Sequence, residues 1–260
     1  MISKTKENII VNEVTSHGFV SVTYLSELLK VSEVTIRNYL DEMEKNGMLR
    51  RVHGGACRIL NMNYEPSADE SDNANSNLKA AIARSAVDLI LDGDIVFFDT
   101  SSTCRMIVKY LDDKKLKNLT VITNSYRTHQ ELMSKEYVRL IHIGGYTSKS
   151  MECSRGPLAL NALKSLRANI SFIGANGLET DGSITCGVFE ETEIKRQAMS
   201  ISAKNYILMD STKFKQSFLS VVGHLSEFDA LITDSKADSK YINEIKKIGC
   251  EIIVANVDES

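Results

Sequence analysis

The sequence predicts an α/β protein in two parts: a small module of helices with a β-hairpin at the N-terminus, and a larger domain built on a mainly parallel sheet. Three observations lead to this prediction. The chain has 260 residues, which exceeds one average domain. From residue 78 onward, apolar runs alternate with amphipathic stretches. These runs are apolar along their whole length, which is typical of parallel strands covered by helices on both faces.

The first sixty residues predict three helices, of which the first covers residues 4–16. Ser21 can cap the second helix, because its hydroxyl can accept a hydrogen bond from a free backbone N–H. The side chains of these two helices that are expected to face the core are Ile9, Ile10, Val14, Leu25, Leu28 and Leu29.

The third helix follows a tight turn and has Ser32 as its natural N-cap. Ile36, Leu40 and Met43 stand at i, i+4 and i+7 and therefore form one packing stripe. Two helices joined by a tight turn, the second with polar residues opposite its stripe, make a helix-turn-helix.

The polar side chains of this third helix suit nucleic acid. At about 100° per residue, Arg37 and Asn38 point away from the stripe. Arginine can pair bidentately with guanine and asparagine with adenine. Hydroxyls near a helix start, such as those of Ser32 and Thr35, suit phosphate oxygens.

A basic hairpin is expected after the third helix, with two short strands around a Gly-Gly turn in residues 48–59. Residues 45–60 carry four basic side chains and no acidic one, although the whole chain has a formal net charge of −3. Such a local positive charge attracts the DNA backbone without reading its sequence. The candidate DNA contacts are Ser32, Thr35, Arg37, Asn38, Arg50, Arg51 and His53.

Two other interpretations of residues 1–60 stay open. One is a small three-helix packing module with a solvated basic edge, because runs of charge are commonly solvated faces. The other is a domain that docks onto a protein. The ordered combination of cap, packing stripe and basic hairpin favours DNA binding.

Residues 61–77 are polar, acidic and poor in branched apolar side chains, so they cannot bury enough surface to fold by themselves. We expect a linker here. It would join a DNA-binding domain of residues 1–60 to a second domain of residues 78–260.

The second domain is expected to alternate strands and helices. The strands are expected at residues 94–98, 119–122, 138–143, 170–173, 206–209, 230–232 and 251–254. The helices are expected at residues 78–91, 103–111, 127–134, 158–167, 190–203 and 239–248. Ligands of such sheets bind beyond the carboxyl ends of the strands.

Polar and small residues follow most of these strands. Residues 99–103 open a helix, where hydroxyls and free N–H groups suit a phosphate. One such turn is more often a helix cap than a binding site, but several at one edge of a sheet favour a ligand. The candidate ligand contacts are Asp99, Thr100, Ser101, Ser102, Thr103, Asn124, Ser125, Gly144, Gly145, Asn176, Lys195 and Lys213.

Two of the polar residues also have ordinary structural interpretations. Lys195 either pairs at the surface with Glu191, four residues earlier, or supplies a cation to the ligand, and both interpretations stay open. His142 lies within an expected strand and is interpreted as a hydrogen-bonded core residue.

The cysteine pattern and the hydropathy exclude several classes of protein. Five cysteines are widely scattered, with no CxxC pair, so we expect reduced thiols, no metal site and no cofactor. The N-terminus lacks the apolar core of a signal peptide, and no apolar run approaches the roughly 20 residues that cross a bilayer. We therefore expect a cytoplasmic protein with no membrane partner.

The N-terminal motif resembles the winged helix-turn-helix signature of the DeoR family of bacterial transcriptional regulators. The match is carried by Thr35-Ile36-Arg37 and by the run from Leu49 to Ala56. Asn38-Tyr39 stands where the family commonly has Arg-Asp. The resemblance implies a module that binds operator DNA.

The second part resembles the sensor domain of the same family. The matching segments are residues 99–103, 123–125, 144–145, 156–157, 174–177 and 210–214, and Glu190-Glu191 with Lys195. The resemblance implies a fold similar to sugar-phosphate isomerases and deaminases, and a phosphorylated sugar or polyol that weakens operator binding. Ser101 replaces a glycine that is frequent in the family's phosphate loop.

Two functions are compatible with these features. The first is a transcriptional regulator, expected to repress a carbohydrate-utilisation operon until the effector binds. Because paired half-sites need paired reading modules, we expect a homodimer or homotetramer. The second is a sugar-phosphate isomerase or deaminase with an added N-terminal module. Asn176 stands where the related enzymes tend to use a carboxylate, and this disfavours catalysis because an amide cannot act as a general base.

Overall fold

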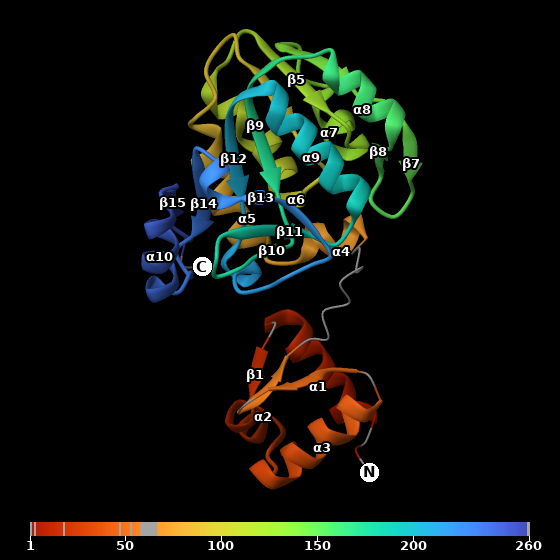
Figure 1. The fold of residues 1–260 in the computed structure, drawn as a ribbon, viewed down its shortest axis with the longest axis vertical. Helices are drawn as coiled ribbons and strands as arrows, with labels where there is room; N and C mark the ends of the chain where they lie inside the picture. The colour runs from red at the N-terminus through yellow and green to blue at the C-terminus, as the bar shows by residue number, and fades with distance from the viewer. Residues whose placement is uncertain are drawn as a thin grey trace. The chain divides into compact units, whose positions relative to one another are not determined.

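The computed structural model describes residues 2, 4–17, 19–46, 48–52, 54–57 and 67–258. The chain divides into two compact units, residues 1–61 and residues 62–260, both drawn in Figure 1. The predicted fold class is confirmed: the first unit is a helix-turn-helix module, and the second is an α/β domain with a parallel sheet.

The first unit contains three helices and a small antiparallel sheet. The helices are α1 (Lys4–His17), α2 (Val22–Leu29) and α3 (Glu33–Lys45). The strands are β1 (Phe19–Ser21), β2 (Arg50–Val52) and β3 (Gly55–Cys57), in the order β1-β3-β2. The hairpin of β2 and β3 was predicted, whereas β1 was not. The backbone N–H of Val22 donates to the carbonyl of Gly54 at 2.9 Å and ties the hairpin to the start of α2.

The predicted caps and most of the predicted core of this unit are confirmed. Ser21 Oγ accepts a hydrogen bond from the backbone N–H of Tyr24 at 3.0 Å. The predictions for Ile9 and Leu28 are wrong, because these side chains are 36% and 43% exposed. On α1 the buried positions are Ile10 and Val14, and Ile9 falls beside them. Helix α2 has only two turns, and Val22, Leu25 and Leu29 supply its inward stripe, so Leu28 falls beside it.

The second unit is built on a seven-stranded sheet in the order β15-β14-β12-β9-β4-β5-β6, in which each neighbouring pair is parallel. Its strands match the seven predicted ones. They are β4 (Ile95–Phe98), β5 (Leu119–Thr123), β6 (Val138–His142), β9 (Ala168–Gly174), β12 (Ser202–Leu208), β14 (Ala230–Asp234) and β15 (Glu251–Ala255).

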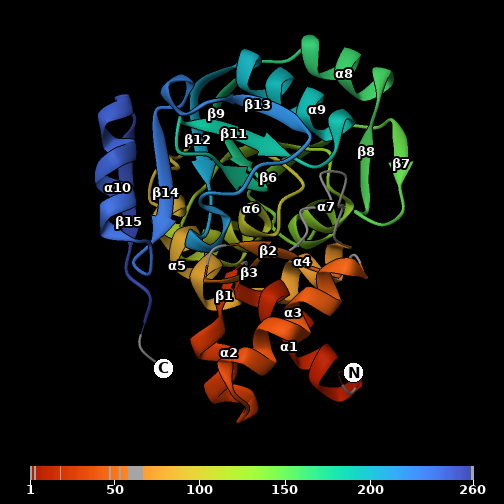
Figure 2. The same cartoon turned by 60° about the horizontal axis from the view of Figure 1, so that its bottom comes forward.

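Helices cover both faces of this sheet, as the continuous apolar strands predicted. They are α5 (Ser76–Val87), α6 (Ser102–Ile107), α7 (Tyr126–Leu132), α8 (Pro157–Lys164), α9 (Phe189–Ile201) and α10 (Ser239–Ile245). Phe97 and Ile173 pack with residues of α8, α9 and α10 on one face. Phe98 and Phe172 pack with residues of α5 and α6 on the other. Helices α8 and α9 lie side by side (Figure 2).

Short strands outside the seven-stranded sheet were not predicted. They are β7 (Tyr146–Ser148), β8 (Cys153–Arg155), β10 (Gly177–Leu178), β11 (Ser183–Cys186) and β13 (Ser220–His224). The 3-10 turns at Ser211–Lys213 and Leu225–Glu227 were not predicted either, whereas those at Val108–Lys114 and Lys246–Ile248 fall at the ends of the helices expected at residues 103–111 and 239–248. These segments are too short or too polar to show an apolar period of their own.

The expected linker is partly helical. Residues 58–66 lie outside the described residues, but Ala68–Asn73 forms helix α4, and α5 already begins at Ser76. A capping box starts α4: Ser67 Oγ accepts from the backbone N–H of Glu70 at 3.2 Å, and Glu70 Oε2 accepts from the N–H of Ser67 at 2.9 Å. Two of the acidic side chains that predicted a linker, Asp69 and Asp72, instead form ion pairs with arginines in the rest of the second unit.

Candidate functional site

Helix α3 presents two of the predicted DNA contacts on its open face. Arg37 and Asn38 are exposed, while the stripe of α3 is buried. Arg37 pairs with Glu33, one turn earlier, at 2.8 Å, and its side chain is still 51% exposed. An exposed guanidinium and an exposed carboxamide next to each other are the groups that can read base edges in a major groove.

Ser32 and Thr35 stand together at the start of α3. Ser32 Oγ accepts from the backbone N–H of Thr35 at 3.2 Å and lies 2.9 Å from Thr35 Oγ1. The helix start therefore carries two hydroxyls beside Arg37.

The hairpin is fastened to α3 by Arg51. Arg51 Nη1 lies 2.5 Å from Asp41 Oδ1, and the backbone N–H of Arg51 donates to Glu44 Oε1 at 2.7 Å. Its side chain is 26% exposed. Arg51 thus has an internal partner in addition to its predicted contact with DNA. Arg50 lies in β2, whereas His53 and Arg58 lie outside the described residues.

In the second unit, the predicted ligand contacts gather at the carboxyl edge of the sheet. Strands β12, β9, β4 and β5 are neighbours in this order. Asp210, Asp99 and Asn124 follow β12, β4 and β5, and Gly174 ends β9. Four adjacent strand ends therefore bring together residues that are up to 111 positions apart in the sequence.

A buried ion pair lies at the centre of this edge. Lys195 Nζ of α9 contacts Asp99 Oδ2, and the residues are 3% and 1% exposed. Burial opposes both charges, yet each charge stabilises the other. The pKa of Asp99 is held below its usual value and the pKa of Lys195 above it. The interpretation of Lys195 as a surface partner of Glu191 is therefore wrong.

Asp99 also orders the loop that follows β4. Its Oδ1 accepts from the backbone N–H of Ser101 at 2.8 Å, and its Oδ2 accepts from the N–H of Gly174 at 2.8 Å. A Cβ on Gly174 would lie 2.4 Å from Ser101, so this approach requires glycine. Ser101 caps α6, and its Oγ accepts from the N–H of Cys104 at 3.2 Å. Thr100 and Ser102 are partly exposed beside it, whereas Thr103 is buried.

Asn124 keeps an unused acceptor. Its Nδ2 donates to the carbonyl of Ser154 at 2.8 Å, while its Oδ1 is buried and has no hydrogen-bond partner among the described residues. Ser125 is occupied as the N-cap of α7, since its Oγ accepts from the N–H of Thr128 at 3.2 Å. A buried carboxamide oxygen without a partner is costly in a folded protein unless a ligand or water supplies a donor.

The remaining predicted residues have different surroundings. A Cβ on Gly145 would lie 2.7 Å from the carbonyl oxygen of Arg155, so Gly145 allows a close approach to β8, whereas Gly144 meets open space. Asn176 Oδ1 accepts from the N–H of Gly187 at 3.1 Å. Lys213 is partly exposed in the turn after β12.

Sequence reasoning missed Lys79. It lies on the inner face of α5 at 4% exposure, and its Nζ donates to the carbonyl of Ser71. Burial lowers its pKa to about 8, although Asp210 acts in the opposite direction. The available signal was its place between Leu78 and Ala81-Ile82-Ala83, on the apolar side of the expected helix.

The interpretation of His142 as a hydrogen-bonded residue is wrong. Both ring nitrogens are buried without a partner among the described residues. The ring stacks on Tyr126 at 5.0 Å between centroids and meets His129 edge-on at 4.9 Å. Burial and the neighbouring His129 hold the pKa of His142 below its usual value. It therefore packs as a neutral aromatic ring.

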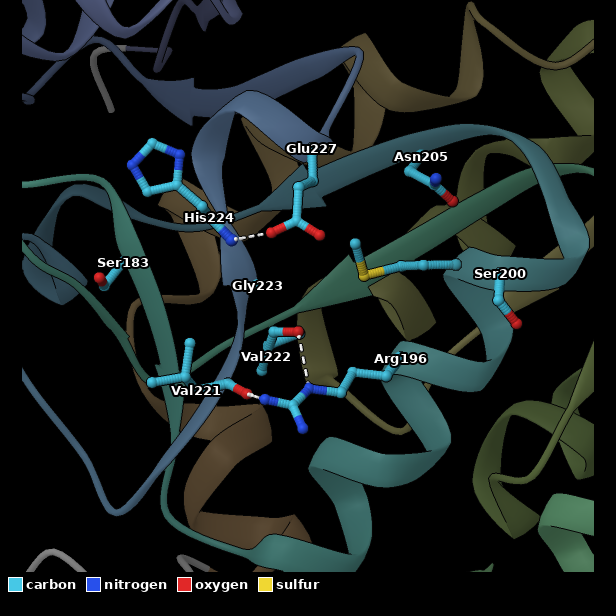
Figure 3. A pocket seen from close by; sticks show the side chains of 10 residues that line it. Ser183, Arg196, Ser200, Asn205, Val221, Val222, Gly223, His224 and Glu227 are labelled. Carbon is cyan, nitrogen blue, oxygen red and sulfur yellow. Dashed lines mark hydrogen bonds between the residues drawn. The ribbon is translucent and has the colours of Figure 1, made fainter.

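A cavity of about 490 Å³ lies elsewhere on the second unit (Figure 3). It is lined by Ser183, Arg196, Met199, Ser200, Asn205, Val221, Val222, Gly223, His224 and Glu227. Figure 3 shows the Arg196 guanidinium turned toward β13, where it donates to the carbonyls of Val221 and Val222. Asn205 precedes the carboxyl half of β12, so the cavity is separate from the edge that carries Asp99. The predicted ligand contacts are absent from its lining.

Two further findings concern metals and membranes. Within the described ranges, no group of three or more His, Cys, Asp or Glu side chains is placed to hold a metal ion. None of the helices in this part of the chain combines the length and apolar character that spanning a bilayer requires.

Comparison with known proteins assigns both units. The model of the DeoR-like helix-turn-helix domain matches residues 7–61, and the model of the DeoR C-terminal sensor domain matches residues 74–235. The chain is 29% identical over 236 residues to the uncharacterized HTH-type transcriptional regulator FruR of Bacillus subtilis, covering 91% of this chain and 93% of that one. It is 30% identical over 233 residues to the L-fucose operon activator of Escherichia coli, covering 89% and 95%.

A putative aga operon transcriptional repressor of Escherichia coli O157:H7 is 28% identical over 254 residues, covering 97% of this chain and 93% of that one. Among solved structures, ribose 5-phosphate isomerase A of Methanocaldococcus jannaschii is 21% identical and covers 55% of this chain and 56% of that one, with a TM-score of 0.41. Both family models, together covering most of the chain, belong to one family. The chain is therefore a member of the DeoR family of transcriptional regulators, with a DNA-binding helix-turn-helix domain and a C-terminal sensor domain.

Proposed function

We propose that this regulator represses a carbohydrate-utilisation operon in the cytoplasm and is released from its operator by a phosphorylated sugar or polyol. The observation that carries this proposal is the carboxyl edge of the sheet. There, Asp99 of the buried pair and Asn124, with its unused oxygen, directly follow the neighbouring strands β4 and β5. Relatives named for the fucose and aga operons support a carbohydrate pathway.

The proposed DNA contacts divide by role. Arg37 and Asn38 would meet base edges, and Ser32 and Thr35 would bind phosphates at the start of α3. Arg50, Arg51 and His53 of the hairpin would add contacts to the DNA backbone.

The proposed effector contacts follow the chemistry of a polyol phosphate. The oxygen of Asn124 can accept a hydrogen bond from a sugar hydroxyl. Thr100, Ser102 and Lys213 can donate to phosphate oxygens. Lys195 neutralises Asp99, whose charge would otherwise repel an anion at this edge.

The regulator would act as a symmetric oligomer. Two half-sites need two copies of α3 at a fixed separation, so the effector can control DNA binding through the arrangement of the copies. The effector weakens DNA binding only if its affinity is lower for the arrangement that fits the operator than for another arrangement.

An isomerase or deaminase activity is the alternative that the comparisons do not favour, because the curated relatives are named as transcriptional regulators. The Asn176 carboxamide cannot take up a proton, and its oxygen already accepts a hydrogen bond from Gly187. We therefore propose that the second unit binds its ligand without turning it over, and that it needs no cofactor.

A shift assay tests the proposal. The full-length chain and DNA from its own promoter region are titrated with a panel of sugar and polyol phosphates, and the matching unphosphorylated sugars serve as controls. We expect one phosphorylated compound to weaken the complex at least fivefold while its unphosphorylated partner leaves it unchanged. If the whole panel leaves the complex intact, the proposal is wrong. If the compound strengthens the complex, the proposed sign of regulation is wrong.

A further inference from the structure

Helix α4 is held against the rest of the second unit by ion pairs, two of which share the carboxylate of Asp72. Asp72 Oδ2 lies 2.6 Å from Arg127 Nη1 and also contacts Arg105. The Asp72 side chain is 16% exposed, and both arginine side chains are 20% exposed. Asp69, one turn earlier, lies 2.7 Å from Arg127 Nη2, but its side chain is 80% exposed. Asp72 is therefore the better buried of the two contacts.

Both arginines belong to helices that begin at the proposed effector edge. Arg105 lies one turn into α6, and its backbone N–H donates to the carbonyl of Ser101 at 3.0 Å. Arg127 is the second residue of α7, which is capped by Ser125. Arg105 therefore follows its cap, Ser101, by one turn, and Arg127 follows its cap, Ser125, by two residues.

The same segment touches a third loop of this edge. Asn75 Nδ2 donates to Thr212 Oγ1 at 3.1 Å and to Asp210 Oδ1 at 3.4 Å. Lys79 Nζ reaches back to the carbonyl of Ser71 in α4. Residues 67–79 thus contact side chains that follow β4, β5 and β12 along the chain. They are also the first described residues after the DNA-reading unit along the chain.

We infer that α4 transmits effector binding to the DNA-reading unit, and that Asp72 is the positioning residue on which the effector's phosphate acts. This inference rests on the proposed function. A phosphate at residues 99–103 brings negative charge to the start of α6. It attracts the guanidinium of Arg105 and repels the carboxylate of Asp72. The contact between α4 and the rest of the second unit then weakens, at the first described residues that follow the DNA-reading unit along the chain.

A purely structural clamp makes a different prediction. If Asp72 only holds the fold together, its loss lowers stability but leaves effector affinity unchanged. If phosphate and Asp72 compete for the same arginines, the loss of the carboxylate makes the effector bind more tightly. The direction of the change in effector affinity therefore separates the two roles.

The experiment compares the full-length wild type with Asp72→Asn and with Asp69→Asn as the matched control. Hydrogen exchange is followed in peptides that cover residues 67–79, with and without a sugar phosphate that calorimetry shows to bind. Without ligand, we expect exchange in this segment to rise on the order of tenfold in Asp72→Asn and to stay at the wild-type rate in Asp69→Asn.

With ligand, the wild-type segment should reach the exchange rate of Asp72→Asn. The Asp72→Asn chain should bind the ligand on the order of fivefold more tightly and should lose most of the response of its operator affinity to ligand. Slower or unchanged exchange in the liganded wild type overturns the inference, as does wild-type coupling in Asp72→Asn. A wild type that binds no phosphorylated compound overturns the proposed function as well, whereas binding without a change in α4 overturns the inference alone.

Discussion

Lys195 and Asp99 are 96 residues apart in the sequence and form an ion pair that is almost completely buried at the carboxyl edge of the sheet. A pair of this kind is expensive to break, because the partner that remains is a buried charge with nothing to neutralise it. It joins α9 to the loop after β4, so the same two side chains stabilise the second unit and lie at the proposed effector edge.

Replacement of Lys195 should therefore destabilise the second unit. We expect Lys195→Met to lower its free energy of unfolding by about 3–5 kcal/mol, measured by urea denaturation. Lys114→Met, which removes a surface partner of Asp88 at 3.5 Å, should cost less than about 1 kcal/mol. Asp99→Asn added to Lys195→Met should recover part of the loss. A loss of equal size in both single variants would contradict the role of the buried pair.

The stability of Lys195→Met should depend on pH with the opposite sign to that of the wild type. In the wild type the pKa of Asp99 lies below its usual value, so its stabilising contribution is complete above about pH 4 and is lost as the pH falls further. In Lys195→Met the hydrogen bonds from Ser101 and Gly174 remain, but burial is the largest influence on the pKa of Asp99 and raises it once the lysine is gone. Relative to the wild type, the variant should gain stability between pH 7 and about pH 4. If the difference in free energy of unfolding between the two chains is constant across this range, the prediction is wrong.

Lys79 should control stability at alkaline pH. Burial lowers its pKa to about 8, so between pH 8 and about 10.5 the unfolded chain binds more protons at this residue than the folded chain. The free energy of unfolding should rise with pH across this window in the wild type relative to Lys79→Met. The difference between the two curves removes the contribution of groups that Lys79 does not touch. A flat difference curve would show that Lys79 keeps an ordinary pKa.

Arg37 should contribute to sequence-specific DNA binding. We expect Arg37→Ala to weaken operator binding by about 1–3 kcal/mol and to affect unrelated DNA less, measured by fluorescence anisotropy at fixed salt. The folded state should be nearly unaffected, because the side chain is exposed. Arg84→Ala in the second unit, whose arginine is 41% exposed and pairs with Asp258, is the control. Equal operator affinities for the two variants would exclude α3 as the reading helix.

Asp41 should restrain the affinity of the hairpin for DNA. Since its carboxylate lies 2.5 Å from Arg51 Nη1, Asp41→Asn leaves Arg51 without this partner and removes one negative charge beside it. Binding to non-specific DNA should strengthen a few-fold at low salt, with a salt dependence steeper by up to about one unit of slope. Glu27→Gln on α2 makes the same change of charge at an exposed position. A similar gain from Glu27→Gln would mean that only net charge matters.

Asn124 should matter for the effector and not for DNA. We expect Asn124→Ala to weaken effector binding by roughly 1–3 kcal/mol by calorimetry, while operator affinity without effector stays at the wild-type value. Asn118→Ala, at the opposite end of the same strand, is the matched control. If both variants bind the effector normally, the unused oxygen of Asn124 does not contact it.

The sequence was sufficient for features that depend on local patterns. The seven parallel strands follow from apolar runs, and the Ser21 and Ser32 caps follow from a hydroxyl before a periodic segment. The helix-turn-helix was predictable for the same reason, since its stripe repeats every turn.

Features that depend on distant partners were not predictable. Helix α4 is acidic and short. Its Asp72 is held by Arg105 and Arg127, which lie 33 and 55 residues after it in the sequence. The partner of Lys195 is likewise remote, so the spacing to Glu191 left its surface and ligand-binding interpretations equally open and gave no sign of Asp99. Strand β1 has three residues and gains its hydrogen bonds only once the hairpin is formed.

The pairing of β1 with β3 makes the first unit complete in itself. The strand before α2 closes the sheet with the hairpin after α3, and the apolar core of the unit draws on all three helices. A domain whose sheet and buried core come from its own residues has what it needs to fold by itself.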